Sequence, residues 1–275
     1  VVGRFVGTEA LAAVGGSTSQ IINLIVGFFT GLASGATVVI SQHYGAKQED
    51  GVQKALHTAY AFSVVGGIII SIMGILITRP LLKLMNTPDN IIDLSATYLC
   101  IYFAGLVFVF IYNVGAGILR AVGDSRRPLY FLILCCFINI VLDIILIVFL
   151  KMGVAGAAIA TTFSQGISAV MVTVTLCRTT DIFRLRVKKI RFHAQPMGMI
   201  VKIGLPAGLQ SVMYSLSNVI IQSSLNTFGT ETVAAWTAFS KIDAIYWMIS
   251  GAFGIAITTF VGQNYGAGKF GRMKK

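Results

Sequence analysis

The chain alternates long apolar stretches with short polar connections. Seven of the stretches are long enough to cross a hydrocarbon core about 30 Å thick at about 1.5 Å per helical residue. They cover residues 17–41, 57–78, 94–119, 129–150, 152–177, 203–228 and 233–261. This pattern predicts an all-α polytopic membrane protein with seven transmembrane helices.

The composition excludes the other broad classes of protein. Hydrophobic residues make up 56% of the 275 residues and charged residues only 11%, with a mean hydropathy of +0.82. A soluble domain carries about 25% charged residues, and a disordered chain combines low hydrophobicity with high net charge. The formal net charge of +11 would indicate nucleic acid in a soluble chain. Between apolar segments it is first a topology signal, so we expect no nucleic-acid partner.

The lysines and arginines of the connections fall on alternate sides of the predicted membrane. One side carries 15 of them, and these are Lys47, Lys54, Arg120, Arg126, Arg127, Arg178, Arg184, Arg186, Lys188, Lys189, Arg191, Lys269, Arg272, Lys274 and Lys275. The other side carries four, which are Arg4, Arg79, Lys83 and Lys151. Because the cation-rich side is normally cytoplasmic, we expect the amino end outside, the carboxyl end inside and the basic segment from Arg178 to Arg191 in the cytoplasm.

Two pairs of short motifs repeat at nearly the same spacing. Gly-Thr-Glu at residues 7–9 recurs at 229–231, each time before a predicted span. Gln-His-Tyr-Gly-Ala at 42–46 recurs as Gln-Asn-Tyr-Gly-Ala at 263–267, each time after a span. Six spans separate the copies, so both cross the membrane in the same direction. Parallel repeats are typical of one class of secondary transporter.

A parallel repeat of this length predicts a larger complete protein of about twelve helices. The chain would then be an internal piece that lacks one helix before Val1 and several after Lys275. We expect residues 1–177 to form most of a first six-helix lobe with five spans. Residues 178–196 are expected to form a basic cytoplasmic linker, and residues 197–275 to begin a second lobe with two spans.

Five motifs within or beside the spans have a characteristic order. They are QHYGA at 42–46, LRAVGDSRRP at 119–128, NIVLD at 139–143, GAAIAT at 156–161 and GLPAG at 204–208. In this order and spacing the chain resembles the bacterial branch of the multidrug and toxic compound extrusion (MATE) transporters. The resemblance implies two six-helix lobes in the cell (inner) membrane that export amphipathic, often cationic drugs or toxic compounds by alternating access.

The same resemblance implies the coupling and the partners. Export would be an exchange for protons or sodium, with no cofactor besides this coupling ion. The partners would be drug-like small molecules and the lipid bilayer, and we expect the protein to work as a monomer.

A flippase for a lipid-linked oligosaccharide, from a related two-lobe exporter family, is the alternative function. It requires a strongly cationic central cavity for pyrophosphate, but the predicted spans contain no Arg and Lys241 is their only interior cation. The flippase therefore ranks lower. An enzyme or metal site is not expected, because the spans hold no paired acids, no nucleophile with a base and no clustered histidines.

Asp143 is the candidate cation-coupling residue, because an ionisable group inside a span is by default functional. Asn139 lies four residues earlier, on the same helical face. A carboxylate beside an amide oxygen can hold a proton when neutral or coordinate sodium when charged; the alternative role for both is a helix-packing hydrogen bond. The resemblance adds Thr161 to this site, although its residue type alone indicates only an interhelical hydrogen bond.

A polar stripe in the sixth span is the candidate substrate surface. Gln210, Tyr214, Asn218 and Gln222 recur at intervals of four residues on one side of an otherwise apolar helix. The stripe would line a cavity or bond neighbouring helices, and the pattern favours neither. Some MATE transporters carry an acidic residue where this chain has Tyr214. We therefore expect Asp143, and not a residue of the sixth span, to couple export to the cation.

The remaining polar and small residues of the spans have structural interpretations. Lys241 and Asp243 lie near the outer end of the seventh span, where we expect snorkelling or mutual pairing. Gly27, Gly31 and Gly35 form a double GxxxG motif that should let a neighbouring helix approach closely, with dimerisation as the alternative.

Overall fold

The computed structural model describes residues 1–85, 87–226 and 230–274, which form helices and connections without any strand. The long helices are α3 (Ser17–Gly45), α4 (Glu49–Leu84), α5 (Asp89–Ala104), α6 (Leu106–Ala121), α7 (Arg126–Asp143), α8 (Gly153–Arg178), α9 (Ala194–Asn226) and α10 (Thr230–Gly266). Within these described residues, six elements are long and apolar enough to span a membrane, and a seventh is the α5–α6 pair, which is bent by 46°. The predicted all-α membrane fold with seven spans is confirmed.

Five short elements complete the chain. They are α1 (Val2–Phe5), α2 (Thr8–Gly15), a π-helical segment η1 (Ile144–Phe149), a 3₁₀ turn η2 (Val187–Lys189) and α11 (Phe270–Met273). The π-helix continues α7 directly, so α7 and η1 together make one span.

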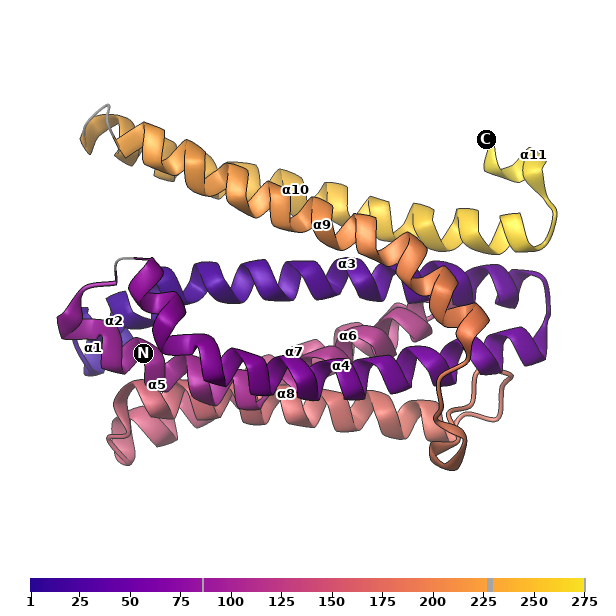
Figure 1. The fold of residues 1–275 in the computed structure, drawn as a ribbon, viewed down its shortest axis with the longest axis horizontal. Helices are drawn as coiled ribbons and strands as arrows, with labels where there is room; N and C mark the ends of the chain where they lie inside the picture. The colour runs from indigo at the N-terminus through magenta and orange to yellow at the C-terminus, as the bar shows by residue number, and fades with distance from the viewer. Residues whose placement is uncertain (86, 227–229, 275) are drawn as a thin grey trace.

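Helices α1 to α8, which we call the first bundle, lie side by side along the long axis of the molecule (Figure 1). Leu82, Leu99 and Phe103 are fully buried where α4, α5 and α6 meet. The opposite surfaces carry large apolar side chains such as Leu76 and Phe149, which are 73% and 74% exposed. A surface of that kind is stable in lipid and not in water, as the hydropathy pattern predicts.

Residues 179–193, which we call the linker, connect α8 to α9 and are docked on the first bundle. Phe183 and Leu185 are buried in the apolar cluster at this end of the bundle. The backbone N–H of Arg186 donates to Nε2 of His57 in α4 at 3.1 Å, and the Gln53 side chain donates to the carbonyl of Arg184 at 3.2 Å. The linker is therefore a packed element of this structure.

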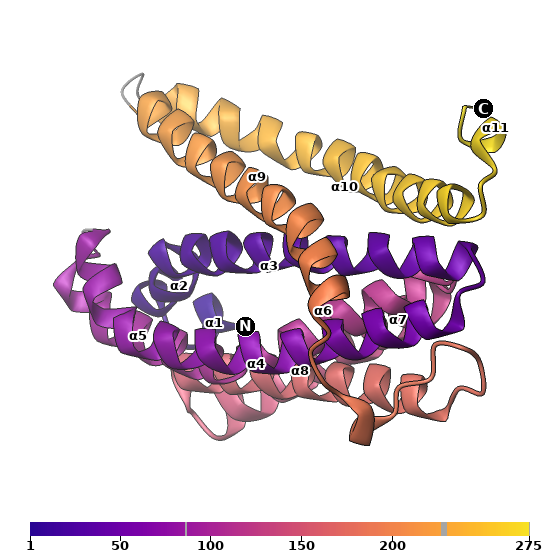
Figure 2. The same cartoon turned by 45° about the vertical axis from the view of Figure 1, so that its right-hand side comes forward.

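Helices α9 and α10, which we call the second pair, cross α3 at one side of the first bundle (Figures 1 and 2). The crossing is close because glycine faces glycine. A β-carbon on Gly31 would overlap the backbone of Gly208, and a β-carbon on Gly35 would overlap that of Gly204. The predicted close approach at the GxxxG motif is confirmed, and its partner is the GLPAG motif of α9.

The second pair meets the first bundle again where α3 and α10 end. A β-carbon on Gly45 would overlap the carbonyl of Gln263, and one on Gly266 would overlap the carbonyl of Gln42. The side chain of Gln263 also donates to the carbonyl of Ala121 in α6 at 2.7 Å. We call this cluster the glycine contact. Toward the beginning of α3, α9 and α10 diverge from the first bundle (Figure 1).

Candidate functional site

Asp143 is the last residue of α7, at the point where the helix changes to the π-helix η1. The residue is half-buried, and its Oδ1 has no hydrogen-bond partner among the described residues. Leaving a buried polar atom unpaired costs about 1–3 kcal/mol, and single-turn π-helices occur frequently at functional sites. The structure thus leaves one carboxylate oxygen of Asp143 without a described partner, next to a π-helical segment.

The two other residues of the predicted coupling site lie beside each other. Nδ2 of Asn139 is 3.5 Å from Oγ1 of Thr161 in α8, and Thr161 donates its own hydroxyl proton to the carbonyl of Ala157 at 2.9 Å. The structure therefore brings Asn139 and Thr161 together across the α7–α8 interface. No hydrogen bond from Asp143 to either of them is present among the described residues, so the structure does not join Asp143 to this pair.

The predicted polar stripe of α9 is only partly described. Gln210, Tyr214 and Asn218 are exposed, and the Tyr214 ring meets the Trp247 ring of α10 edge to face at 5.7 Å. The side chain of Gln222 lies outside the described residues. Tyr214 thus packs within the second pair, whereas Gln210 and Asn218 make no hydrogen bond to another described residue.

Of the two charged residues in the seventh span, only Asp243 has a described side chain. It accepts a hydrogen bond from Nε1 of Trp247 at 3.1 Å, one turn further along α10. The side chain of Lys241 lies outside the described residues, so its predicted pairing with Asp243 stays a prediction. A bond within one helix accounts for Asp243 without a functional role.

The sequence placed Arg120 directly after the third predicted span, and the structure places it in the last turn of α6. Helix α6 continues to Ala121, and Arg120 lines a pocket between α3, α6 and α10. Arg120 therefore lies at a helix end, one residue beyond the predicted span of residues 94–119. The hydropathy pattern ended the span at residue 119 because a charged residue there lowers the local mean.

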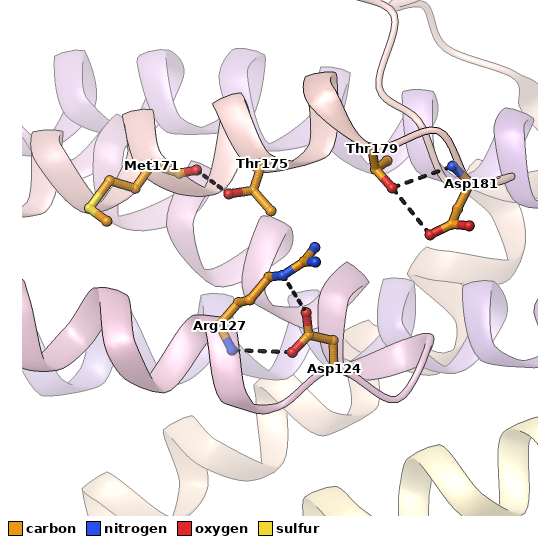
Figure 3. A network of polar contacts seen from close by, with 6 residues as sticks. All are labelled: Asp124, Arg127, Met171, Thr175, Thr179 and Asp181. Carbon is orange, nitrogen blue, oxygen red and sulfur yellow. Dashed lines mark hydrogen bonds and ion pairs between the residues drawn. The ribbon is translucent and has the colours of Figure 1, made fainter.

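The ends of α7 and α8 near the linker are fixed by local polar contacts (Figure 3). Asp124 accepts from the backbone N–H of Arg127 at 3.1 Å and pairs with its guanidinium at 3.2 Å. After α8, the Thr179 hydroxyl bonds the Asp181 carboxylate at 3.2 Å. The Asp124 carboxylate is therefore paired with Arg127.

Apolar spanning helices, an intramembrane carboxylate and two helix groups that touch at one end define the chain as part of an integral membrane transporter. The model of the MatE family matches residues 1–145 and 206–275. The chain belongs to this family, the MATE transporters, and therefore to a class of transporters and not of enzymes. It is a multi-pass membrane protein.

The curated relatives carry names of two kinds. The probable multidrug resistance protein YoeA of Bacillus subtilis is 32% identical over the whole chain, which corresponds to 60% of the relative. The FAD transporter of Shewanella oneidensis is 27% identical over 98% of the chain and 60% of the relative. The chain thus spans about three fifths of the length of these relatives.

Solved structures share the same arrangement of helices. A multidrug resistance MATE family transporter in an outward-facing conformation superimposes with a TM-score of 0.90 at 27% identity, over 99% of this chain and 60% of that one. A MATE transporter in a bent conformation gives 0.92 at 26% identity, over 99% and 61%. The arrangement of the helices is therefore that of known MATE transporters.

Proposed function

We propose that the complete protein exports amphipathic drug-like molecules across the cell membrane in exchange for protons or sodium. The names of the multidrug resistance relatives support export, and the unpaired carboxylate of Asp143 supports coupling to a cation. Another relative is named a FAD transporter, so the names of the relatives do not agree on one substrate. We propose that the protein works as a monomer.

The coupling site in this proposal consists of Asp143, Asn139 and Thr161. Asp143 carries the charge that a proton neutralises or a sodium ion pairs with. The Asn139 and Thr161 side chains, 3.5 Å apart, supply neutral oxygen atoms from the same interface. Oxygen ligands of this kind suit a hard monovalent cation as well as a proton relay.

The conformational change in this proposal opens and closes the glycine contact. The predicted topology puts residues 45 and 266 on the cytoplasmic side, so the end that the glycine contact closes would be the cytoplasmic one. Separation of the first bundle from the second pair at this end would expose the space between them to the cytoplasm. The α9 stripe at Gln210, Tyr214, Asn218 and Gln222 remains the candidate for substrate contacts on the second pair.

The test is transport by the full-length protein reconstituted in vesicles. A fluorescent cationic dye is loaded inside, and a proton or a sodium gradient is imposed separately. The proposal expects gradient-driven efflux with one of the two ions and no efflux without a gradient. Equal rates with and without either gradient would contradict coupled export.

A further inference from the structure

A polar pocket of about 670 Å³ lies where the linker docks on the first bundle. The beginning of α4 forms one wall and the linker forms the other, at the end of the bundle where α8 leads into the linker (Figure 2). Three acidic and six cationic side chains line the pocket, so its formal charge is positive. The cations are Lys54, Arg184, Arg186, Lys188, Lys189 and Arg191.

The acidic side chains of the pocket do not neutralise the cations of the linker. The Asp50 carboxylate pairs with Nζ of Lys54 at 2.6 Å, so both partners of this pair belong to α4. The side chains of Arg186, Lys188 and Lys189 make neither an ion pair nor a hydrogen bond with another described residue. Three charges that line the pocket thus have no described counter-charge, and an anion would supply one.

The backbone that carries these cations is held in place by hydrogen bonds. The N–H of Arg186 donates to Nε2 of His57 in α4 at 3.1 Å, and the N–H of Leu185 donates to the carbonyl of Leu176 at 2.9 Å. In the turn η2, the N–H of Lys189 donates to the carbonyl of Arg186 at 2.8 Å. Because the backbone is already ordered, binding of a ligand costs less conformational entropy here than on a disordered basic segment.

Two apolar side chains of the linker indicate which kind of anion fits. Val187 and Phe192 lie among the cations in the sequence and are 63% and 50% exposed, whereas Phe183 and Leu185 are buried against the bundle. Exposed apolar side chains beside lysine and arginine are typical of segments that lie in the interface of a bilayer with anionic lipids. None of the residues that line the pocket is Phe, Tyr or Trp, on which the base of a nucleotide would stack.

We propose that this pocket binds the phosphodiester headgroup of an anionic membrane lipid. Arg186, Lys188 and Lys189 donate to the phosphate oxygens, while Val187 and Phe192 enter the apolar layer beneath the headgroups. Because three unpaired charges exceed the charge of one phosphodiester, a headgroup with two phosphates binds more tightly than a headgroup with one. The inference adds a second binding site to the protein and does not rest on the proposed export function.

The experiment measures lipid binding to the full-length protein in an uncharged detergent. Short-chain phosphatidylglycerol, cardiolipin and phosphatidylcholine are titrated separately, and native mass spectrometry gives the apparent Kd of the first bound lipid. We expect the two anionic lipids to bind more tightly than phosphatidylcholine. Combining Arg186→Gln with Lys189→Gln should weaken binding of the anionic lipids about tenfold or more and leave phosphatidylcholine unchanged. The dependence of anionic-lipid binding on salt should become shallower as well.

Two further variants separate the pocket from general charge and from misfolding. Arg126→Gln combined with Arg272→Gln removes two exposed cations outside the pocket, on the same side of the predicted membrane. It should bind all three lipids as the unmodified protein does. Arg186→Lys combined with Lys189→Arg keeps both charges and should retain binding of the anionic lipids. An unmodified protein without a preference for anionic lipids, or equal losses in the two Gln double variants, would overturn the inference.

Hydrogen exchange locates the site and identifies the source of the phosphate. Phosphatidylglycerol should slow amide exchange in peptides from residues 179–193 of the unmodified protein, but not in those of the Arg186→Gln, Lys189→Gln variant. Inorganic phosphate and glycerol 3-phosphate should protect the linker only at much higher concentrations. Protection by either at the concentration of the lipid would assign the pocket to a free phosphate compound and overturn the lipid assignment, as would lipid protection confined to other segments.

Discussion

Gly45 and Gln263 meet backbone against backbone, so closely that a β-carbon on the glycine would overlap the glutamine carbonyl. The same relation holds between Gly266 and Gln42. Two helix ends that approach this closely accept no larger residue without moving apart.

We therefore expect Gly45→Ala to shift the protein toward a form in which this end is open. Overpacking of this kind costs about 1–3 kcal/mol, which is enough to change the populations of two conformations severalfold. Spin labels at Lys47 and Lys269, both exposed, should report longer distances in the variant. Gly198→Ala is the control, because its β-carbon would meet nothing within 4 Å; equal distances in all proteins would contradict the expectation.

Asp143→Asn should abolish ion-driven export while folding and membrane insertion survive. The substitution keeps the size of the side chain and removes its charge, and Asp143→Glu should retain partial exchange because the charge is displaced by only one methylene. Asp243→Asn is the matched control and should cost much less, since Asp243 bonds only Trp247 of its own helix among the described residues. Efflux from vesicles under a proton or sodium gradient measures this. Wild-type rates in Asp143→Asn would make Asp143 a structural residue.

Lys188→Cys, in a background without native cysteines, should react with an impermeant thiol reagent only after the cells are permeabilised. The reason is the excess of lysine and arginine on that side. Lys151→Cys, on the side of the membrane with few lysines and arginines, should react in intact cells. The side chains of Lys188 and Lys151 are both exposed. Labelling of Lys188→Cys from outside would reverse the proposed topology.

Acidification should loosen the linker through His193. Its Nε2 accepts from Nε of Arg191 at 3.1 Å, while its Nδ1 lies 3.1 Å from Oγ1 of Thr58. Burial, followed by the nearby charges of Arg191, Lys54 and His57, lowers the pKa of His193, and Asp50 opposes this effect. The neutral form of His193 is therefore the one that holds the linker against α4. This docking of the linker is complete above the ordinary histidine pKa of about 6.5, and it is lost as the pH falls through the lowered pKa of His193.

A spin label at exposed Val187 measures this loosening. Its mobility should rise between about pH 8 and about pH 5. In His193→Gln the mobility should depend less on pH over this range than in the unmodified protein. A wild-type spectrum that stays constant with pH would contradict a role for His193.

Hydropathy was sufficient to predict the seven spans, because the cost of placing polar groups in lipid is a property of each stretch by itself. It placed the ends less well. Helix α4 covers Glu49–Leu84 although the predicted span covers residues 57–78, because a helix continues into the polar region beyond the hydrocarbon core. The same effect puts Arg120 in the last turn of α6, one residue beyond the predicted span.

Features that depend on packing could not be predicted from single stretches. The π-helix at Ile144–Phe149 follows an apolar run that has no distinguishing residue type. The bond from Arg186 to His57 joins positions 129 residues apart. The spacing of Asn139 and Asp143 was visible in the sequence, whereas the Asn139–Thr161 approach depends on how α7 packs against α8. The coupling role of all three stays a prediction.

The glycine contact resembles the interface of a symmetric dimer, although one chain supplies both sides. Gly45 of the first motif contacts Gln263 of the second motif, and Gly266 of the second contacts Gln42 of the first. Two identical subunits related by a two-fold axis contact each other in this same reciprocal, isologous way. Because the surface is complementary to itself, the sequence needs only one such motif, present in two copies, to form both sides of the interface. A change in one copy therefore alters one half of the interface and leaves its symmetric counterpart intact.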